Sequence, residues 1–169
     1  MYSNFYFHHY GLKIVNCRFF NSFGPGEVPG QYRNVIPNFI YWSMQDKSLP
    51  LTGTGDETRD FTYVLDLVQG LIKAAFYEDA IGQAFNLASG KETKIKDMIA
   101  MVNKSTGSTT PITQFPPRKW DTKKRLLASI ELAGKVIDYK PIISFEEGLN
   151  ENFKWFSNNW KNVQLSADF

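Results

Sequence analysis

The feature that most constrains the fold is an apolar segment, Lys13–Phe20, that runs directly into a glycine- and proline-rich stretch, Asn21–Asn34. β-Branched and aromatic residues dominate the first segment, which is typical of a strand buried on both faces. The aromatic segment Ser3–Tyr10 precedes it and ends at Gly11, so we expect the second half of a helix there. A helix that leads into a buried strand predicts a parallel α/β fold.

The stretch Asn21–Asn34 is longer than an ordinary turn and holds the turn-forming residues Gly24, Pro25, Gly26, Pro29 and Gly30. Loops of this length in a compact domain usually carry function. Ligands of α/β proteins bind at the carboxyl ends of the parallel strands, which is where this loop begins. We therefore predict that the functional site starts at Asn21.

The rest of the chain alternates between helical and strand patterns. Apolar residues recur at helical spacing in segments 35–44, 67–76, 95–102, 129–136 and 145–160. Short apolar runs predict strands at 49–51, 61–64, 84–88 and 111–115. We expect the later helices to be capped by Asp66, Thr93, Ser129 and Ser144, the last in a capping box with Glu147. We expect the tail after Asn162 to be frayed.

Composition excludes several classes of protein. The chain has 169 residues, of which 43% are hydrophobic and 15% aromatic, so it can form a core and is not disordered. Its 19 basic and 17 acidic residues leave a net charge of +2, too weak a field for a general binder of nucleic acids or membrane surfaces. The lone Cys17 excludes an internal disulfide and a multi-cysteine metal site. We expect a soluble, cytoplasmic protein without a membrane span or a metal.

Five polar residues lie in predicted loops at the ends of these elements: Asn21, Asn34, Arg59, Arg118 and Asp121. Arginine presents a planar fork of N–H donors that suits phosphate oxygens. Two arginines from separate loops can therefore hold a diphosphate without making the whole protein basic. Ordinary surface charge is the alternative interpretation, and composition does not decide between the two.

Two longer motifs add to this pattern. Arg18–Pro25 has the sequence RFFNSFGP, and Gly53–Asp66 has the sequence GTGDETRDFTYVLD. Further motifs follow in order at Phe85–Gly90, Arg118-x-x-Asp121 and Phe145–Leu149. Together they resemble the extended short-chain dehydrogenase/reductase family of NAD-dependent nucleotide-sugar epimerases and dehydratases. The resemblance covers nearly the whole chain.

It covers, however, only the C-terminal half of that family. The chain has no glycine-rich cofactor fingerprint, and none of its tyrosines is followed four residues later by lysine, although a Tyr-x-x-x-Lys pair supplies the family's general base. We expect a fragment without a catalytic residue of its own. The resemblance implies an α/β fold, the C-terminal part of a doubly wound Rossmann-type sheet with a small mixed substrate-binding lobe. Residues 1–34 would close the dinucleotide-binding domain, and residues 35–169 would form mainly the lobe, with some elements returning to the sheet.

The resemblance also implies roles for individual residues. Substrate would be bound by Asn21, Asn34, Val35, Arg59, Phe61, Arg118 and Asp121. The two arginines would clamp the diphosphate, and Asp121 would reach a ribose or sugar hydroxyl. Phe20 and Asn21 would lie next to NAD, the family's cofactor, which we do not expect to bind tightly to this chain alone.

The reaction that the resemblance implies is 4-epimerisation of a UDP-sugar through a 4-keto intermediate, by hydride transfer to NAD in an enzyme that forms a homodimer. A 4,6-dehydratase or a glucuronate decarboxylase of the same family is an alternative, because all three reactions share that ketone. A non-catalytic module that binds a nucleotide sugar is a third interpretation. The sequence does not identify the sugar, and we expect the chain alone to be inactive.

Overall fold

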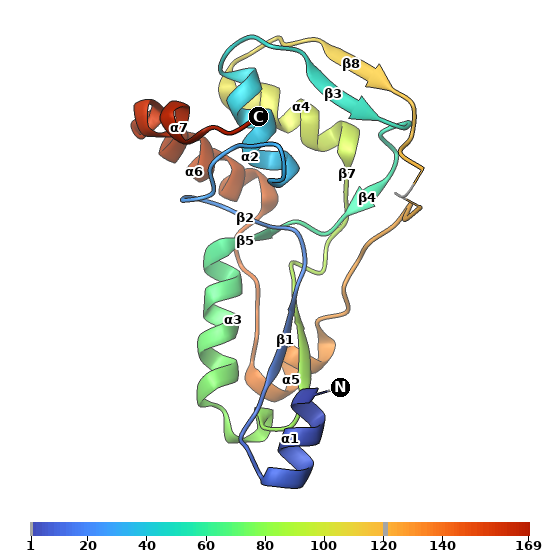
Figure 1. Ribbon diagram of the computed structural model, residues 1–169, viewed down its shortest axis with the longest axis vertical. Helices are drawn as coiled ribbons and strands as arrows, with labels where there is room; N and C mark the ends of the chain where they lie inside the picture. The colour runs from blue at the N-terminus through green and yellow to red at the C-terminus, as the bar shows by residue number, and fades with distance from the viewer. Residues whose placement is uncertain (1, 120–121) are drawn as a thin grey trace.

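The computed structural model describes residues 2–119 and 122–169 (Figure 1). The helices are α1 (Tyr2–Tyr10), α2 (Val35–Ser43), α3 (Val64–Phe76), α4 (Ile95–Thr106), α5 (Glu131–Ile137), α6 (Phe145–Asn158) and α7 (Trp160–Ser166), with a 3₁₀ turn η1 (Glu78–Ala80). The strands are β1 (Asn16–Phe19), β2 (Ser22–Phe23), β3 (Leu49–Thr52), β4 (Thr58–Arg59), β5 (Thr62–Tyr63), β6 (Ala84–Leu87), β7 (Thr93–Lys94) and β8 (Ile112–Phe115).

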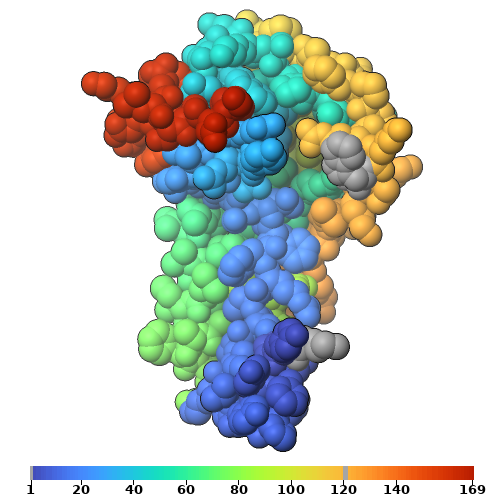
Figure 2. All heavy atoms as spheres, viewed as in Figure 1, coloured from blue at the N-terminus to red at the C-terminus, as the bar shows by residue number. Residues whose placement is uncertain are grey.

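These elements form two bodies, one above the other in Figure 1. The lower body contains α1, α3, α5 and the parallel pair β1–β6, in which Asn16 lies opposite Ala84. The upper body, the wider of the two in Figure 2, contains α2, α4, α6, α7 and the parallel pair β3–β8. Parallel β2–β5 lies between them, and antiparallel β4–β7 lies beside the upper body, next to α4. The predicted α/β fold with parallel strands is confirmed, and the described strands pair two by two.

Each body has its own apolar core. In the upper body, α2, α4 and α6 pack against one another and bury Ile36, Met98 and Leu149. In the lower body, Phe85 and Leu87 of β6 are buried among side chains of α3 and α5. Removing such side chains from water is the main favourable contribution to folding. The chain therefore holds two packing centres connected by short strands.

Asp60, between β4 and β5, is fully buried and joins segments that are distant in sequence. Its carboxylate accepts hydrogen bonds from the Ser89 N–H and hydroxyl at 2.9 and 2.6 Å, the Gly90 N–H at 3.0 Å and the Ala128 N–H at 3.3 Å. A buried charge is tolerated when its hydrogen bonds are satisfied in this way. Because Ser89 follows β6 and Ala128 precedes α5, Asp60 ties the lower body to the strands between the two bodies.

Asp66 likewise bonds a segment that is distant in sequence, the chain that leads into α6. It lies in the first turn of α3, and its carboxylate accepts hydrogen bonds from the N–H groups of Ile142 and Ile143, each at 3.0 Å. The prediction that Asp66 caps α3 is wrong, because the helix begins at Val64 and Tyr63 occupies the cap position without a side-chain hydrogen bond. The carboxylate serves a distant segment instead of its own helix.

Two further capping predictions are wrong. Helix α4 starts after Lys94 rather than after Thr93, and α5 starts after Ile130 rather than after Ser129. Neither helix has a side-chain hydrogen bond at its cap. Thr93 belongs to β7, so its backbone is already used in pairing with β4. At Thr93, pairing with β4 therefore prevails over the local capping signal.

The end of the chain differs from the prediction as well. The capping box of Ser144 and Glu147 is confirmed, with the Glu147 N–H donating to Ser144 Oγ at 3.2 Å and the Ser144 N–H to Glu147 Oε2 at 2.9 Å. The predicted fraying after Asn162 is wrong, because α7 continues to Ser166 and buries Val163 in the upper core. The tail thus belongs to the upper body.

Strand β1 is shorter and less buried than predicted. It begins at Asn16 rather than Lys13, and Phe19 is 54% exposed. Within the described chain β1 pairs only with β6, so its other edge is uncovered. The prediction of a strand buried on both faces is wrong, because Asn16 and Cys17 are only half-buried and Arg18 and Phe19 are exposed.

Two observations apply to residues 2–119 and 122–169. None of the helices there combines the length and the apolar character needed to cross a membrane. The same residues contain no group of three or more histidine, cysteine, aspartate or glutamate side chains arranged to hold a metal ion. Cys17 is a free thiol, and burial raises its pKa.

Candidate functional site

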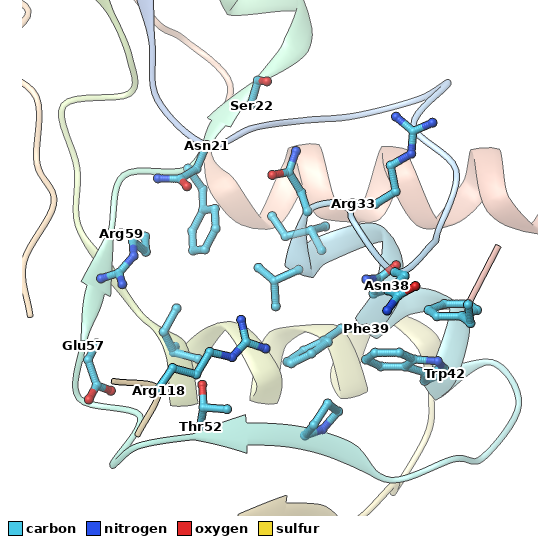
Figure 3. Close-up of a pocket in the computed structure, with 18 of the residues that line it drawn as sticks. Asn21, Ser22, Arg33, Asn38, Phe39, Trp42, Thr52, Glu57, Arg59 and Arg118 are labelled. Atoms are coloured by element: carbon cyan, nitrogen blue, oxygen red, sulfur yellow. The ribbon is translucent and has the colours of Figure 1, made fainter. Parts of the chain in front are cut away.

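A cavity of about 520 Å³ opens in the upper body (Figure 3). Its walls come from the loop after β1, from α2, from β3 and β4, and from the segment around Arg118. Small-molecule sites in proteins are typically concave spaces of this size with mixed apolar and polar walls. The cavity begins at Asn21, where the sequence predicted the functional site.

Asn21 lies where β1 ends and the chain turns into β2. Its φ of 26° is in the left-handed region, which asparagine tolerates better than most residues. Its carbonyl accepts a hydrogen bond from the Thr62 N–H at 3.2 Å, and its Nδ2 donates to the Asp60 carbonyl, also at 3.2 Å. Both contacts come from the segment around β5, so they hold Asn21 at the cavity wall.

Asn34 and Val35 lie at the start of α2 and line the cavity. Asn34 Nδ2 donates a hydrogen bond to Glu27 Oε1 at 2.7 Å. Partial burial raises the pKa of the Glu27 carboxyl, and the hydrogen bond from Asn34 acts in the opposite direction. The bond fixes the orientation of the Asn34 amide at the end of the long loop.

Arg59, on β4, lines the same cavity. Its Nη1 donates hydrogen bonds to the Thr58 carbonyl at 2.8 Å and to the Lys123 carbonyl at 3.0 Å. These bonds hold a planar guanidinium beside the cavity in one orientation. A guanidinium held in this way can present its N–H groups to the oxygens of a phosphate.

The chain that follows Arg118 is linked to β4 through Glu92, the residue before β7. Arg125 donates to Glu92 through Nε at 2.8 Å and Nη2 at 2.7 Å, and the Thr58 hydroxyl donates to Glu92 Oε1 at 2.6 Å. These bonds lower the pKa of Glu92 from its ordinary 4.5 to about 2. Because β4 is held to this segment, Arg118 is brought to the same cavity as Arg59.

Figure 3 shows that the cavity is lined both by guanidinium groups and by aromatic rings. The rings of Phe39 and Trp42, both on α2, form an aromatic side, and Arg59 lies at the opposite end of the view. Arg118 is drawn between Arg59 and Phe39, and a third arginine of the wall, Arg33, lies on the side of Trp42. Glu57 also lines the cavity. Its carboxylate accepts a hydrogen bond at 2.9 Å from the Gly55 N–H, in the glycine-rich turn. Guanidinium groups suit an anion and aromatic rings suit a flat apolar group, so the cavity can take a ligand that has both.

Six of the residues predicted to bind substrate line this one cavity: Asn21, Asn34, Val35, Arg59, Phe61 and Arg118. Asp121 lies outside the described residues. Phe20, predicted to lie next to a cofactor, is half-buried and is not among the residues that line the cavity. The structure thus brings the predicted residues together, while what each of them binds stays a prediction.

The sequence did not predict two aromatic residues of the wall, Trp42 and Phe169. Trp42 lies on a helix whose apolar spacing indicates only a buried face. Phe169 lies in the tail that was predicted to be frayed. The adjacent rings of Tyr41 and Trp42, just outside the predicted apolar face of α2, were the one local signal for a second aromatic surface.

A family model described as the NAD dependent epimerase/dehydratase family matches residues 3–88, half of the chain. The chain belongs to this family. The matched region contains Asn21, Asn34 and Arg59 of the cavity, together with the motif Gly53–Asp66.

Curated relatives carry different reactions. The chain is 32% identical over 151 residues to the UDP-N-acetyl-alpha-D-glucosaminuronate decarboxylase of Bacillus cytotoxicus, covering 86% of this chain and 47% of that protein. It is 33% identical over 158 residues to the UDP-glucuronate 4-epimerase of Thermodesulfobacterium geofontis, covering 91% of this chain and 46% of that protein. The chain spans about half the length of the curated relatives that it matches.

Solved structures agree with the fold over the same extent. The epimerase Mth375 of Methanothermobacter thermautotrophicus matches 99% of this chain and 50% of its own, at 49% identity and a TM-score of 0.97. The Bordetella bronchiseptica enzyme WbmF, solved in complex with NAD+ and UDP, matches 97% of this chain and 52% of its own, at 34% identity and a TM-score of 0.85. The fold described above is therefore an α/β fold found in epimerases of this family.

Proposed function

We propose that this chain is the substrate-binding part of an NAD-dependent nucleotide-sugar enzyme, and that its cavity binds the nucleoside diphosphate part of a UDP-sugar. The observation that carries the proposal is that Arg59 and Arg118, from separate segments, line the same cavity as the rings of Phe39 and Trp42. A nucleoside diphosphate has the matching chemistry, a doubly anionic group joined to a flat ring system. The complex of WbmF with UDP supports the same ligand class.

Individual roles follow from this placement. Arg59 and Arg118 would donate hydrogen bonds to the diphosphate oxygens, in the bidentate manner that guanidinium groups favour. Asn34 and Val35, at the start of α2, would lie near the base. Phe61 would close the wall beside the sugar, and the predicted contact of Asp121 with a hydroxyl belongs to the same end.

For the reaction we favour 4-epimerisation of a UDP-sugar. The curated relatives include an epimerase and decarboxylases, so the family supports either reaction. The residues of this chain do not by themselves form an NAD site, because only Phe20 and Asn21 lie at the carboxyl end of β1, and the chain contains neither a glycine-rich fingerprint nor a Tyr-x-x-x-Lys pair. We therefore derive no hydride-transfer step from it and propose that the chain alone does not turn over a UDP-sugar.

Calorimetric titration with UDP tests the binding proposal. We expect UDP to bind the chain, uridine to bind much more weakly because it lacks the diphosphate, and Arg59→Ala to abolish measurable UDP binding. Arg18→Ala is the matched control, since Arg18 is an exposed arginine on β1 that does not line the cavity. Lys119→Ala is the corresponding control for Arg118→Ala. Equal UDP affinity in Arg59→Ala and Arg18→Ala would contradict the proposal.

A non-catalytic nucleotide-sugar-binding module is the second candidate, favoured by the missing Tyr-x-x-x-Lys pair. The two candidates differ when the chain is combined with a polypeptide that supplies the first half of the family fold, such as the first half of Mth375. Conversion of UDP-glucose to UDP-galactose by the combination, but not by either part, would support the enzyme. UDP binding without turnover in the combination would favour the module.

A further inference from the structure

The tail after α7 reaches the cavity instead of extending into solvent. The Phe169 ring lies 5.6 Å from the Tyr41 ring and 5.3 Å from the Trp42 ring, centroid to centroid, and Phe169 lines the cavity. In Figure 1 the carboxyl end of the chain lies beside α2, far from the lower body. The last residues of the chain thus meet the long loop that begins near its start.

Backbone contacts join the tail to that loop. The Gln31 N–H donates a hydrogen bond to the Asp168 carbonyl at 2.6 Å, and Gly30 and Asp168 form a parallel β-bridge. A Cβ at position 30 would lie 2.8 Å from the Asp168 oxygen, closer than real Cβ atoms approach an oxygen. Glycine at position 30 is therefore what lets the tail lie this close.

The same glycine is held from the opposite direction by α2. The Gly30 N–H donates to Asn38 Oδ1 at 2.8 Å, and Asn38 Nδ2 donates to the Gly30 carbonyl at 2.9 Å. Asn38 is buried, so this pair of bonds is shielded from water. Gly30 is fixed between a helix and the tail, immediately before Gln31, Arg33 and Asn34, which line the cavity.

We propose that residues 168–169, which we call the tail strap, are a positioning element of the nucleotide site. The Asp168 carbonyl holds the loop 30–34 in its binding conformation, and the Phe169 ring completes the aromatic side of the cavity against which the base of the nucleotide packs. The proposal rests on the proposed function, since it assumes a nucleoside diphosphate in the cavity. Phe169 is 55% exposed in the free chain, which leaves ring surface for a ligand to cover.

Preorganisation and packing each contribute to affinity. A loop held in place before binding loses less conformational entropy when the ligand arrives. An aromatic ring that packs on a base adds a contact that does not depend on which base it is. The ring of Phe169 also holds the tail on α2, so loss of the ring removes both contributions together.

The experiment compares Phe169→Ala with Phe169→Tyr and with Leu165→Ala, an exposed residue of α7 that does not line the cavity. Two readouts are measured on each full-length variant: UDP affinity by calorimetry, and hydrogen exchange of the Gln31 amide. We expect Phe169→Ala to weaken UDP binding about tenfold and to speed Gln31 exchange about tenfold, with Phe169→Tyr and Leu165→Ala close to the unsubstituted chain. Melting temperatures should be nearly equal in all three, since none of these side chains is buried.

Gly30→Ala disrupts the same contact from the side of the loop, because its Cβ would collide with the Asp168 oxygen. It should therefore also weaken UDP binding and speed Gln31 exchange. Unchanged Gln31 exchange in Phe169→Ala would overturn the tail strap, whatever the chain binds. Unchanged UDP affinity with faster exchange would overturn its role in the site. Absence of UDP binding by the unsubstituted chain would instead overturn the proposed function, while the exchange measurement still decides whether the strap holds the loop.

Discussion

The two bodies of the molecule differ in how completely they bury their apolar side chains. In the upper body, α2, α4 and α6 cover one another, and Ile40, Met98 and Phe156 are completely buried. In the lower body, α1 buries no residue at all, and Phe76 at the end of α3 is 81% exposed. Both cores are buried, but the lower body also leaves apolar side chains of α1 and α3 in contact with solvent. An apolar face of this kind usually marks a surface that packs against another chain or domain.

The difference explains why the cavity belongs to the upper body. One wall is α2, whose Ile36 and Phe39 are buried in the upper core, and that packing holds this side of the cavity in place. The lower body contributes through Asp60. The Asp60 carboxylate is bonded to the chain that follows β6, the Asp60 carbonyl accepts a hydrogen bond from Asn21, and Arg59 directly precedes Asp60. Four predictions follow the contrast between the bodies from the largest effect to the smallest.

The first prediction compares two phenylalanines. Phe156→Ala removes a fully buried ring of the upper core and should lower the free energy of unfolding by about 3–5 kcal/mol, the usual cost of such a cavity. Phe76→Ala removes a ring that is largely in water and should change it by less than about 0.5 kcal/mol. Urea denaturation monitored by circular dichroism measures both. Similar losses for the two variants would show that the exposed face of the lower body is covered in solution.

The second prediction concerns the connection between the bodies. Asp60→Ala removes the acceptor of the N–H groups of Ser89, Gly90 and Ala128, of which Ala128 is buried and the other two are half-buried; each group that finds no substitute costs about 1–3 kcal/mol. We expect a loss of about 3 kcal/mol and a melting temperature lower by roughly 6–12 °C. Asp79→Asn, at an exposed position on η1, is the control and should melt like the unsubstituted chain. A small effect of Asp60→Ala would mean that other contacts, such as those of Asp66 with Ile142 and Ile143, suffice to hold the two bodies together.

Local signals predicted the parts of the fold whose cause is local. The capping box at Ser144 and the apolar spacing of α6 depend on residues within a few positions of each other, and both were predicted. Asp66 was misinterpreted because its partners, Ile142 and Ile143, come from the other end of the chain. The tail was misinterpreted for the same reason, since its contact with Gly30 has no local sequence signature.

The residues of the candidate site likewise fall into those that the sequence predicted and those that it did not. Asn21, Arg59 and Arg118 were predicted through motifs, because a family resemblance carries information about residues that meet only in the fold. Trp42 was missed because helical spacing does not distinguish a ring that faces a core from one that faces a cavity. Phe169 was missed because nothing near it in the sequence indicates that the chain turns back across α2.

The third prediction uses the uncovered face of the lower body. We expect the isolated chain to self-associate at micromolar concentrations through exposed aromatic residues such as Tyr6 and Tyr10 on α1. Tyr10→Ser should weaken that association about tenfold, since burial of an aromatic ring contributes more than the 1.4 kcal/mol that a factor of ten requires. Sedimentation velocity measures the association. Tyr32→Ser in the upper body, where the ring is also exposed, should leave it unchanged.

The smallest predicted effect is electrostatic and concerns Glu92, which pairs with Arg125 and accepts a hydrogen bond from Thr58 of β4. Hydrogen bonds from Arg125 and Thr58 lower the pKa of Glu92 to about 2, below its ordinary 4.5. A carboxyl whose pKa is lower in the folded protein stabilises the fold above the unfolded pKa and loses that contribution as the pH falls towards the folded pKa. We therefore expect the melting temperature to contain a contribution from Glu92 that disappears between about pH 4.5 and pH 2.

Glu92→Gln should remove this part of the pH dependence and leave the profile above pH 6 parallel to that of the unsubstituted chain. Because the pair is exposed to solvent, the difference should be small and should shrink further in 1 M salt. A pH profile of Glu92→Gln that coincides with that of the unsubstituted chain down to pH 2 would mean that Arg125 and Thr58 do not hold the Glu92 carboxylate in solution.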